Sequence, residues 1–428
     1  MDQAVARLLQ QAAHMRSMGR LMEAGRLANQ ALALQPGEPQ TLNLLGLISL
    51  ERGAFQDAQT HFLEAVEAEP GEAALWMNLA SSQRAMSDDS GEENALKKAL
   101  ALDQRNLMAH VRMAELKQRQ SEGHIAAEHW NKVIALAGNL AEPPAALVKI
   151  LGSAREFVRR YNDGLAVSVA AHLAQQMGEV DAQAKRRFQA CLDKEFGRRI
   201  IYQNECHGLH YPFLPADEFF DRGHFPWMAA LEAQTGAIRA EFLTLIESHG
   251  AQLRPYVRQE PGTPKNKWTP LSQSLDWGAI FLWEYGVAND AVLRSCPKTV
   301  AALENLPRAD ISGRAPSVFF SILKPGSHIP PHTGMTNSRA IIHLPLIVPG
   351  DCAFRVGGET RPWREGEAFA FDDTIEHEAW NNSDEMRVVL IFDVWNPHLT
   401  LAEQALLKQF YSVADAWKQT HIHAPEAL

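Results

Sequence analysis

Small residues recur at a fixed interval along the first third of the chain. The aligned positions at an offset of 34 are Ala12, Gly46, Ala80 and Ala114, then Gly19 with Gly53, and Pro36 with Pro70. Two antiparallel helices pack closely only where side chains are small, and a proline ends the second helix before the next unit. The interval therefore predicts a stack of helical hairpins. A generic alanine-rich helical bundle is the alternative interpretation.

These positions resemble the tetratricopeptide repeat, a helical hairpin with a period of 34 residues, over roughly residues 5–140. The match is closest in the first two units. Later, Glu92 replaces the expected alanine, Gln104 replaces the expected proline, and Ser-Asp-Asp-Ser interrupts the pattern near position 88. The resemblance implies a groove for a protein or peptide partner. Helical patterning continues to residue 200 after Pro143-Pro144, which predicts a connecting or capping layer.

After about residue 200 the apolar positions form short runs of strand length without intervening helices. The predicted strands cover 279–285, 318–323, 340–348, 352–356, 368–371 and 388–395. Turn signals separate them, including Pro-Gly at 325–326 and 349–350 and Gly-Gly at 357–358. This spacing predicts a sandwich or jelly roll, closed by a helix from about 401 to 420. We therefore expect three parts: a repeat domain (1–140), a helical connector (141–200) and a β-domain (201–428).

Composition narrows the functional class. A chain of 428 residues is long enough for two or three domains, and 46% apolar with 21% charged residues is ordinary for globular protein. The net charge of -10 and the isolated basic clusters without interleaved aromatics argue against nucleic acid. Four scattered cysteines indicate reduced thiols, and no apolar run is long enough for a signal peptide core or a transmembrane helix. We expect a cytoplasmic protein.

Two histidines and an arginine stand out among the β-like segments. His332 lies in Pro-Pro-His-Thr-Gly, His377 follows 45 residues later, and Arg387 opens an apolar strand ten residues beyond it. Neutral imidazoles suit Fe(II), and an arginine fork suits a carboxylate. A buried arginine needs an anionic partner, either a ligand or a structural salt bridge. The pattern indicates an iron site that also holds a dicarboxylate, as in 2-oxoglutarate oxygenases.

Several separated motifs, in order, resemble the aspartyl/asparaginyl β-hydroxylase family over roughly residues 200–400. They are Ser321-Ile-Leu-Lys-Pro-Gly-Ser-His-Ile-Pro-Pro-His-Thr-Gly, Asn337-Ser-Arg, His343-Leu, Trp363-x-x-Gly366-Glu, Phe371-Asp-Asp-Thr-x-Glu-His-Glu-x-Trp380, and Arg387 through Asp393-Val-Trp-x-Pro397. The resemblance implies a double-stranded β-helix, a jelly-roll or cupin-like fold. It also implies an enzyme that couples decarboxylation of 2-oxoglutarate, using O2, to hydroxylation of an unactivated C–H bond.

Site roles follow from the resemblance, position by position. His332 and His377 would bind Fe(II), and Gly334 stands where a facial triad would place a carboxylate, a gap that the family shares. Water would occupy the vacated position, and Asp373 could accept a hydrogen bond from it; the alternative for Asp372 and Asp373 is a turn with solvent-exposed acids. Arg387 would bind the distal carboxylate of 2-oxoglutarate with help from the Ser321 hydroxyl. His343 resembles a residue that contacts this cosubstrate, although a core histidine is an equal alternative.

The chain departs from the family at the substrate end. Family members acting on acidic or amide side chains usually show two arginines before the histidine that matches His343. Here Arg339 is present as a candidate substrate-binding residue, but Ile341 occupies the second place. The sequence therefore predicts a target less acidic than aspartate, although an Asp, Asn or other peptide side chain stays open.

Two other classes compete with an oxygenase. In one, the repeats bind a partner and the β-domain is a non-catalytic cupin remnant. In the other, a cupin scaffold carries a metal-dependent hydrolase or isomerase, which usually offers three or four protein ligands. His332, His377 and Arg387 occur together, and only two metal ligands are evident, so the oxygenase is favoured over both.

Overall fold

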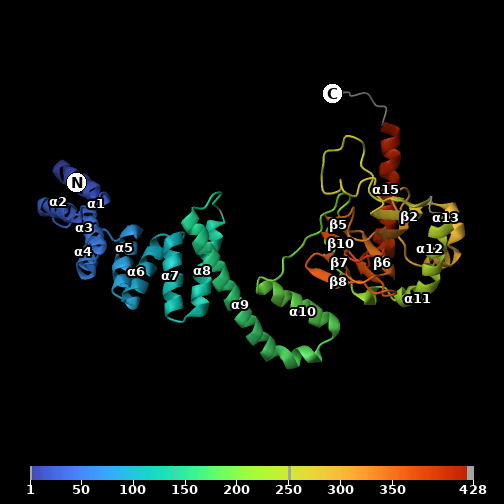
Figure 1. The fold of residues 1–428 in the computed structure, drawn as a ribbon, viewed down its shortest axis with the longest axis horizontal. Coiled ribbons are helices and arrows are strands. Elements are labelled where there is room, and N and C mark those ends of the chain that lie inside the picture. The colour runs from blue at the N-terminus through green and yellow to red at the C-terminus, as the bar shows by residue number, and fades with distance from the viewer. Residues whose placement is uncertain (1, 139, 249–251, 422–428) are drawn as a thin grey trace. The chain divides into compact units, whose positions relative to one another are not determined.

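The computed structural model describes residues 2–138, 140–248 and 252–421, so residues 422–428 of the predicted β-domain lie outside it. Contacts divide the chain into two compact units, Met1–Val180 and Asp181–Leu428 (Figure 1). The division falls inside the segment 141–200. Within the described residues, no helix combines the length and apolar character required to cross a membrane.

The first unit is a row of helices in which each packs against the next along the chain (Figure 1). They are α1 (Gln3–Ser17), α2 (Leu21–Leu34), α3 (Pro39–Glu51), α4 (Phe55–Ala68), α5 (Ala73–Ala85), α6 (Asp89–Leu102), α7 (Leu107–Arg119), α8 (Gly123–Ala137) and α9 (Ala145–Glu179). The hairpins α1/α2, α3/α4, α5/α6 and α7/α8 reproduce the interval of 34 residues. The predicted helical repeat is confirmed.

Close helix packing explains the recurring small residues. A Cβ added to Gly46 in α3 would lie 2.4 Å from a ring carbon of Phe62 in α4, so only glycine fits there. The aligned Ala12, Ala80 and Ala114 are fully buried. At the turns between paired helices, Gly19 and Gly53 adopt φ of +74° and +77°, a conformation in which glycine avoids Cβ strain.

Two of the three sequence departures in the third repeat are accommodated locally. Asp88, in the interrupting Ser-Asp-Asp-Ser, accepts a 2.9 Å hydrogen bond from the N–H of Gly91 and so caps α6. Glu92 is fully buried where the repeat expects alanine, and it pairs with Arg119. Burial raises the pKa of Glu92, which Arg119 opposes.

The second unit contains two antiparallel sheets. The larger has the order β1-β2-β4-β11-β6-β9, with β3 also pairing with β2, and the smaller has the order β5-β10-β7-β8. Their strands are β1 (Arg254–Pro255), β2 (Trp277–Glu284), β3 (Val287–Ala288), β4 (Val318–Leu323), β5 (Ser327–His332), β6 (Arg339–Ile347), β7 (Cys352–Val356), β8 (Glu359–Pro362), β9 (Phe369–Phe371), β10 (His377–Asn381) and β11 (Arg387–Trp395). This double-stranded β-helix confirms the predicted fold class.

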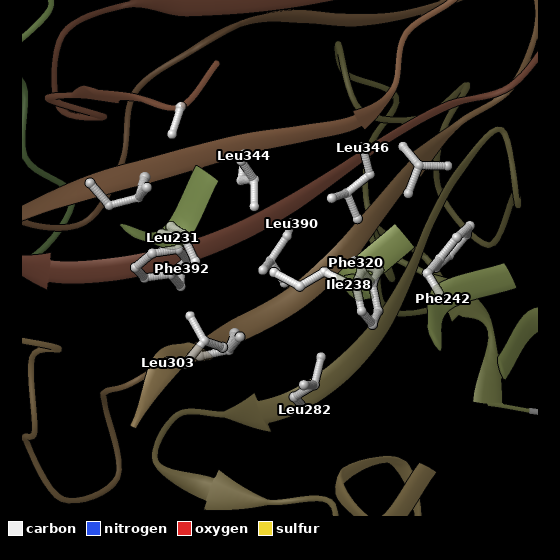
Figure 2. Packing of buried hydrophobic residues seen from close by; sticks show 14 of the residues in the cluster. Leu231, Ile238, Phe242, Leu282, Leu303, Phe320, Leu344, Leu346, Leu390 and Phe392 are labelled. Carbon is white, nitrogen blue, oxygen red and sulfur yellow. The ribbon is translucent and has the colours of Figure 1, made fainter. Parts of the chain in front are cut away.

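Both faces of the larger sheet are buried, and successive side chains of each strand point to opposite faces. One apolar cluster takes Phe320, Leu344, Leu390 and Phe392 on one face and packs them against Phe242 and other helix residues (Figure 2). The helices of this unit are α10 (Ala182–Glu195), η1 (Arg222–His224), α11 (Met228–Glu232), α12 (Thr235–Ser248), α13 (Asp290–Ser295), α14 (Pro297–Leu303) and α15 (Leu401–His421).

The opposite face of the larger sheet meets the smaller sheet. A second apolar cluster joins Phe319, Val389 and Ile391 of the larger sheet to Ile329, Phe354 and Ala379 of the smaller one. Strand pairing fixes which side chains share this face, because residues two apart point the same way. Ser321, His343 and Arg387 stand at positions of this inward face, so the polar candidates enter a space between the sheets.

Candidate functional site

A cavity of about 570 Å³ opens between the two sheets. Its lining includes all seven residues predicted as site residues: Ser321, His332, Arg339, His343, Asp373, His377 and Arg387. These residues come from β4, β5, β6, β10, β11 and the segment between β9 and β10. The fold therefore brings together residues that span 66 positions of the sequence.

His332 and His377 face each other across a strand pair. His332 ends β5, His377 begins β10, and the two are direct partners in the antiparallel register. Their ring centroids are 4.0 Å apart. Both histidines lie within short strands that were not among the strands predicted from the sequence.

Each of these rings is fixed by the same local hydrogen bond. Nδ1 of His332 is 2.8 Å from the carbonyl of Pro330, and Nδ1 of His377 is 3.0 Å from that of Ile375. A carbonyl only accepts, so each Nδ1 carries the proton and each Nε2 carries a lone pair. Burial lowers the pKa of His332 to about 4 and that of His377 well below its usual range. Two neutral imidazoles with free lone pairs could ligate a divalent metal.

The position of a third protein ligand is closed. A Cβ on Gly334 would lie 2.1 Å from Oδ2 of Asp373, so the Asp373 carboxyl group occupies the space of a side chain at 334. The N–H of Gly334 donates to the carbonyl of Asp373 over 2.6 Å. Within the described ranges, no group of three or more His, Cys, Asp or Glu side chains is arranged to hold a metal ion. The protein offers two imidazoles and an adjacent carboxyl group.

Asp372 and Asp373 are not solvent-exposed turn acids. Asp372 is fully buried, and burial raises its pKa to about 6 against the hydrogen bonds from Thr374. Burial likewise raises the pKa of Asp373 to about 7, against the nearby charge of Arg339. Asp372 is therefore not a solvent-exposed acid, and Asp373 is a half-buried residue of the cavity lining.

Arg387 lies at the other end of β11 from Asp393, and the buried part of the cavity around it is here called the inner end. Arg387 has no counter-ion in the described part of the chain. It is 1% exposed, and its Nε and Nη2 have no hydrogen-bond partner. Burial lowers its pKa to about 9, since no carboxylate compensates the charge. Its guanidinium stacks 4.2 Å above the centre of the Trp363 ring. An uncompensated buried cation next to open space is a receptor for an anion.

Other polar side chains beside Arg387 also lack hydrogen-bond partners. Eight buried side-chain nitrogen and oxygen atoms among the described residues lack a partner, and four belong to cavity-lining His343, Trp363 and Arg387. The Ser321 hydroxyl accepts from the Trp277 indole over 3.1 Å and from Arg387 over a long 3.5 Å. Its own proton is therefore available to a ligand.

At the other end of the cavity, here called the outer end, the charge of the arginine is compensated. Arg339 pairs with Asp393, which is 2% exposed and also accepts a 2.8 Å hydrogen bond from the N–H of Ser317. Ile341 is directly opposite Asp393 in the strand register. Tyr256 stacks on Trp277 at 3.9 Å between ring centres, and Phe281 stacks on Phe319 at 4.9 Å. A neutralised arginine lines this end, and the aromatic stack extends along the cavity to Trp277, which bonds Ser321.

Sequence reasoning missed the tryptophans of the site. Trp363 was noticed as part of a motif and Trp277 not at all, yet one carries an unpartnered N–H and the other orients Ser321. Trp268 packs edge-on against His332 with 4.9 Å between ring centres. No spacing in the sequence marks an indole as a hydrogen-bond donor to a ligand, since its usual role is packing.

Comparisons with known proteins identify relatives of the second unit. The sequence pattern of the family described as aspartyl/asparaginyl beta-hydroxylase matches residues 232–397. The chain is 35% identical over 205 residues to the ornithine lipid ester-linked acyl 2-hydroxylase of Rhizobium tropici, covering 47% of this chain and 69% of that protein. It is 41% identical over 132 residues to the mouse aspartyl/asparaginyl beta-hydroxylase, covering 30% of this chain and 18% of that protein. The match thus spans less than a fifth of the mammalian relative.

Among solved structures, a crystal structure of MamA superposes on 37% of this chain and 84% of its own, with a TM-score of 0.32 and 20% identity. The family assignment rests on the second unit, where motif order, family pattern and a relative matched over more than two thirds of its length agree. The chain belongs to the aspartyl/asparaginyl β-hydroxylase family.

Proposed function

We propose that the second unit is a hydroxylase of unactivated C–H bonds that depends on Fe(II) and 2-oxoglutarate. The observation that carries this proposal is the set of unpartnered donors on Trp363 and Arg387, together with the unpartnered Nδ1 of His343, in the cavity that His332 and His377 also line. A dicarboxylate satisfies such donors, and a pair of neutral imidazoles suits Fe(II). The hydroxylases among the relatives support the same chemistry.

In this proposal His332 and His377 bind the metal through Nε2, held in place by their carbonyl-bonded Nδ1 atoms. The Asp373 carboxyl group, which fills the space beside Gly334, accepts a hydrogen bond from water at the position without a protein ligand. Fe(II), 2-oxoglutarate and O2 together supply the oxidation: one oxygen atom enters the substrate C–H bond, and the other enters succinate as CO2 is released. The protein holds the reactants and keeps bulk water out.

The inner end of the cavity would bind the distal carboxylate of 2-oxoglutarate. Arg387 offers Nε and Nη2 as the two tines of a fork, which matches a carboxylate in geometry and charge. The Ser321 hydroxyl donates its proton to the same group. Stacking on Trp363 holds the guanidinium plane in a fixed orientation. His343 and the Trp363 indole then supply the further donors for cosubstrate oxygens.

At the outer end we infer a neutral substrate group. Arg339 remains the candidate substrate-binding residue, but Asp393 already compensates its charge, and Ile341 adds no second cation. A carboxylate here would be desolvated without a full partner, at a cost of several kcal/mol. A neutral peptide side chain, an amino acid derivative or an acyl chain fits better, and one relative is named for an acyl substrate.

The central experiment is anaerobic binding of Fe(II) and 2-oxoglutarate to the full chain, followed by exposure to O2 and measurement of succinate. We expect succinate that depends on all three additions. Absence of succinate from protein that binds neither iron nor 2-oxoglutarate would favour the non-catalytic interaction protein instead.

The substrate inference has its own test. Peptide panels containing Asp, Asn or neutral target residues would be searched by mass spectrometry for a gain of one oxygen atom, with Ile341→Arg run beside the unmodified protein. We expect Asp peptides to be poor substrates that improve at least tenfold in Ile341→Arg, since one charge-assisted bond is worth about 1.5–3 kcal/mol. Efficient hydroxylation of Asp peptides by the unmodified protein, unimproved by Ile341→Arg, would contradict the inference.

For the first unit we propose binding of a protein or peptide partner, in keeping with its repeated helical hairpins. The proposed location is the cytoplasm. All four cysteines are free thiols, which fits a reducing compartment.

A further inference from the structure

Residues 204–211, here called the brace, run beside both segments that flank the paired histidines. One segment, 333–337, follows His332, and the other, 372–374, precedes His377. Backbone N–H groups of the brace donate to both: Glu205 to the carbonyl of Thr374 (2.8 Å), His207 to that of Gly334 (3.1 Å) and Gly208 to that of Met335 (2.8 Å). The brace thus ties together two stretches that lie outside the sheets.

Asn204 anchors one end of the brace. Its amide nitrogen donates to Oδ2 of Asp372 over 2.8 Å and to the Thr374 hydroxyl over 2.9 Å. Thr374 in turn donates from its hydroxyl and its N–H to the other oxygen of Asp372. Both oxygens of the Asp372 carboxylate therefore accept hydrogen bonds, which restricts rotation of residue 373 between Asp372 and Thr374.

Asn337 anchors the other end. It is fully buried, accepts from the N–H of Tyr211 over 2.7 Å and donates to the carbonyl of Tyr211 over 2.9 Å. Gly208 lies so close that a Cβ there would stand 2.9 Å from the carbonyl oxygen of Met335. Both ends of the brace are thus fixed, and its centre contacts the backbone on either side of the Gly334–Asp373 contact.

One backbone hydrogen bond joins the two flanking segments directly, from Gly334 to Asp373. A single hydrogen bond would let the two segments rotate relative to each other, whereas the brace adds a third stretch of the chain that is hydrogen-bonded to both segments. We propose that the brace sets the position of the Asp373 carboxyl group beside Gly334, and that Asn204 is a positioning residue for the metal site. The proposal rests on the proposed function, because it assigns Asn204 a role only if His332 and His377 hold a metal.

The test uses Co(II) alone as the probe, since its visible spectrum reports the geometry of its site. Full-length Asn204→Ala is compared with Asn382→Ala, in which an exposed amide just after β10 is removed. Loss of a group that orients a metal's surroundings typically costs 10–100-fold in affinity. We expect Asn204→Ala to bind Co(II) about tenfold more weakly than Asn382→Ala, with a changed spectrum at saturation.

Two further variants separate positioning from simple loss of stability. Asn204→Asp keeps the shape, removes the amide donors and adds a carboxylate beside that of Asp372, so we expect an effect at least as large as that of Asn204→Ala. Gly208→Ala displaces the brace without touching Asn204, and the same spectral change is expected. Either of these can be read if Asn204→Ala does not fold. Unfolding temperature is measured for the metal-free forms, because a purely structural residue would lower it while leaving the Co(II) spectrum of the folded protein unchanged.

The outcomes distinguish the two proposals. If the unmodified protein binds Co(II) while every folded brace variant matches Asn382→Ala in affinity and spectrum, the brace inference is overturned and the proposed function stands. Wild-type behaviour of Asn204→Asp would likewise overturn the assignment to donated hydrogen bonds. If the unmodified protein takes up no Co(II) or Fe(II), the proposed function itself fails, and the brace has no metal site to position.

Discussion

Two of the histidine pairs among the described residues, one in each unit, look alike in the distance between their rings and in their lowered pKa. His110 and His129 in the first unit have ring centres 5.1 Å apart, and His332 and His377 in the second are 4.0 Å apart. Burial is the main cause of a lowered pKa in all four rings. Neither the distance nor the neutral state distinguishes a structural pair from a functional one.

Hydrogen bonding separates the pairs. Nδ1 of His110 lies 2.9 Å from Nδ1 of His129, and Nε2 of His110 donates to the carbonyl of Gln104 over 3.0 Å. The lone pair on Nδ1 of His110 therefore accepts the hydrogen bond from His129. In the other pair, each Nδ1 donates to a carbonyl two residues back, which leaves the lone pair of each ring on Nε2. A candidate metal site is recognised by lone pairs without donors, not by a cluster of imidazoles.

The largest expected effect comes from removing one free lone pair. His332→Ala or His377→Ala should abolish Fe(II) binding and 2-oxoglutarate turnover, because a single imidazole does not hold Fe(II) at ordinary concentrations. His110→Ala is the matched control and should leave both unchanged. Succinate production by purified, iron-supplied protein measures the difference. Full turnover by either site mutant would place the metal elsewhere and erase the distinction between the pairs.

The next largest effect is expected at Arg387, the proposed site for the carboxylate of 2-oxoglutarate. Arg387→Ala should raise the 2-oxoglutarate concentration needed for half-maximal turnover by about 10–100-fold, as a charge-assisted bond of about 1.5–3 kcal/mol is lost. Arg387→Lys should recover part of this, since an ammonium cannot form a fork. Arg308, whose Nη1 also lacks a partner but which lies outside the cavity, provides the control Arg308→Ala. Unchanged 2-oxoglutarate dependence in both Arg387 variants would mark a structural role.

If the second pair alone is functional, the first unit should be dispensable for decarboxylation. A chain beginning near residue 195 keeps the brace and every candidate ligand, and we expect it to retain most of the iron-dependent turnover of 2-oxoglutarate. It lacks α10, whose Arg186 pairs with Glu359 of β8 over 2.7 Å, so some loss of stability is expected. Insolubility, with recovery only when the chain starts at 141, would show that the connector belongs to the β-domain.

The smallest effect concerns acid stability of the first pair. Burial lowers the pKa of His129 to about 4, so the unfolded ring takes up a proton near pH 6.5 while the folded one resists it. The stabilising contribution is present above about pH 6.5 and is lost as the pH falls toward 4. For a half-exposed ring we expect about 1 kcal/mol. Denaturant unfolding at pH 7 and pH 5 should show a smaller acid loss in His129→Gln; an equal loss would contradict this account.

Local patterns predicted much of the fold but not the strands that carry the histidines. The repeat interval and the six apolar runs were predictable because each depends on the buried face of a single segment. In contrast, β5 contains Pro330-Pro331 and β10 begins with His377-Glu378, so neither has the composition of a strand. Their pairing joins residues 45 positions apart, and only the assembled sheet supplies it.

The same limit applies to the site. Motif order indicated His332, His377 and Arg387, because these residue types have few structural uses in apolar surroundings. The unpartnered indole of Trp363 and the compensation of Arg339 by Asp393 are properties of pairs that meet only after folding. Sequence alone therefore identified the candidate site residues but not the charge balance at the two ends of the cavity.

Strand β11 serves the cavity and the helix-packed core on alternate residues. Arg387, Val389, Ile391 and Asp393 face one side, and Val388, Leu390, Phe392 and Val394 face the other. A one-residue deletion within this stretch would exchange the two sets and place Arg387 or Asp393 in the apolar core. Variant libraries for this protein should therefore keep the strand's length fixed. Libraries that vary Ile391, which lines the cavity, would test which substrate is accepted, while those that vary Val388 and Leu390 would test how well the protein folds.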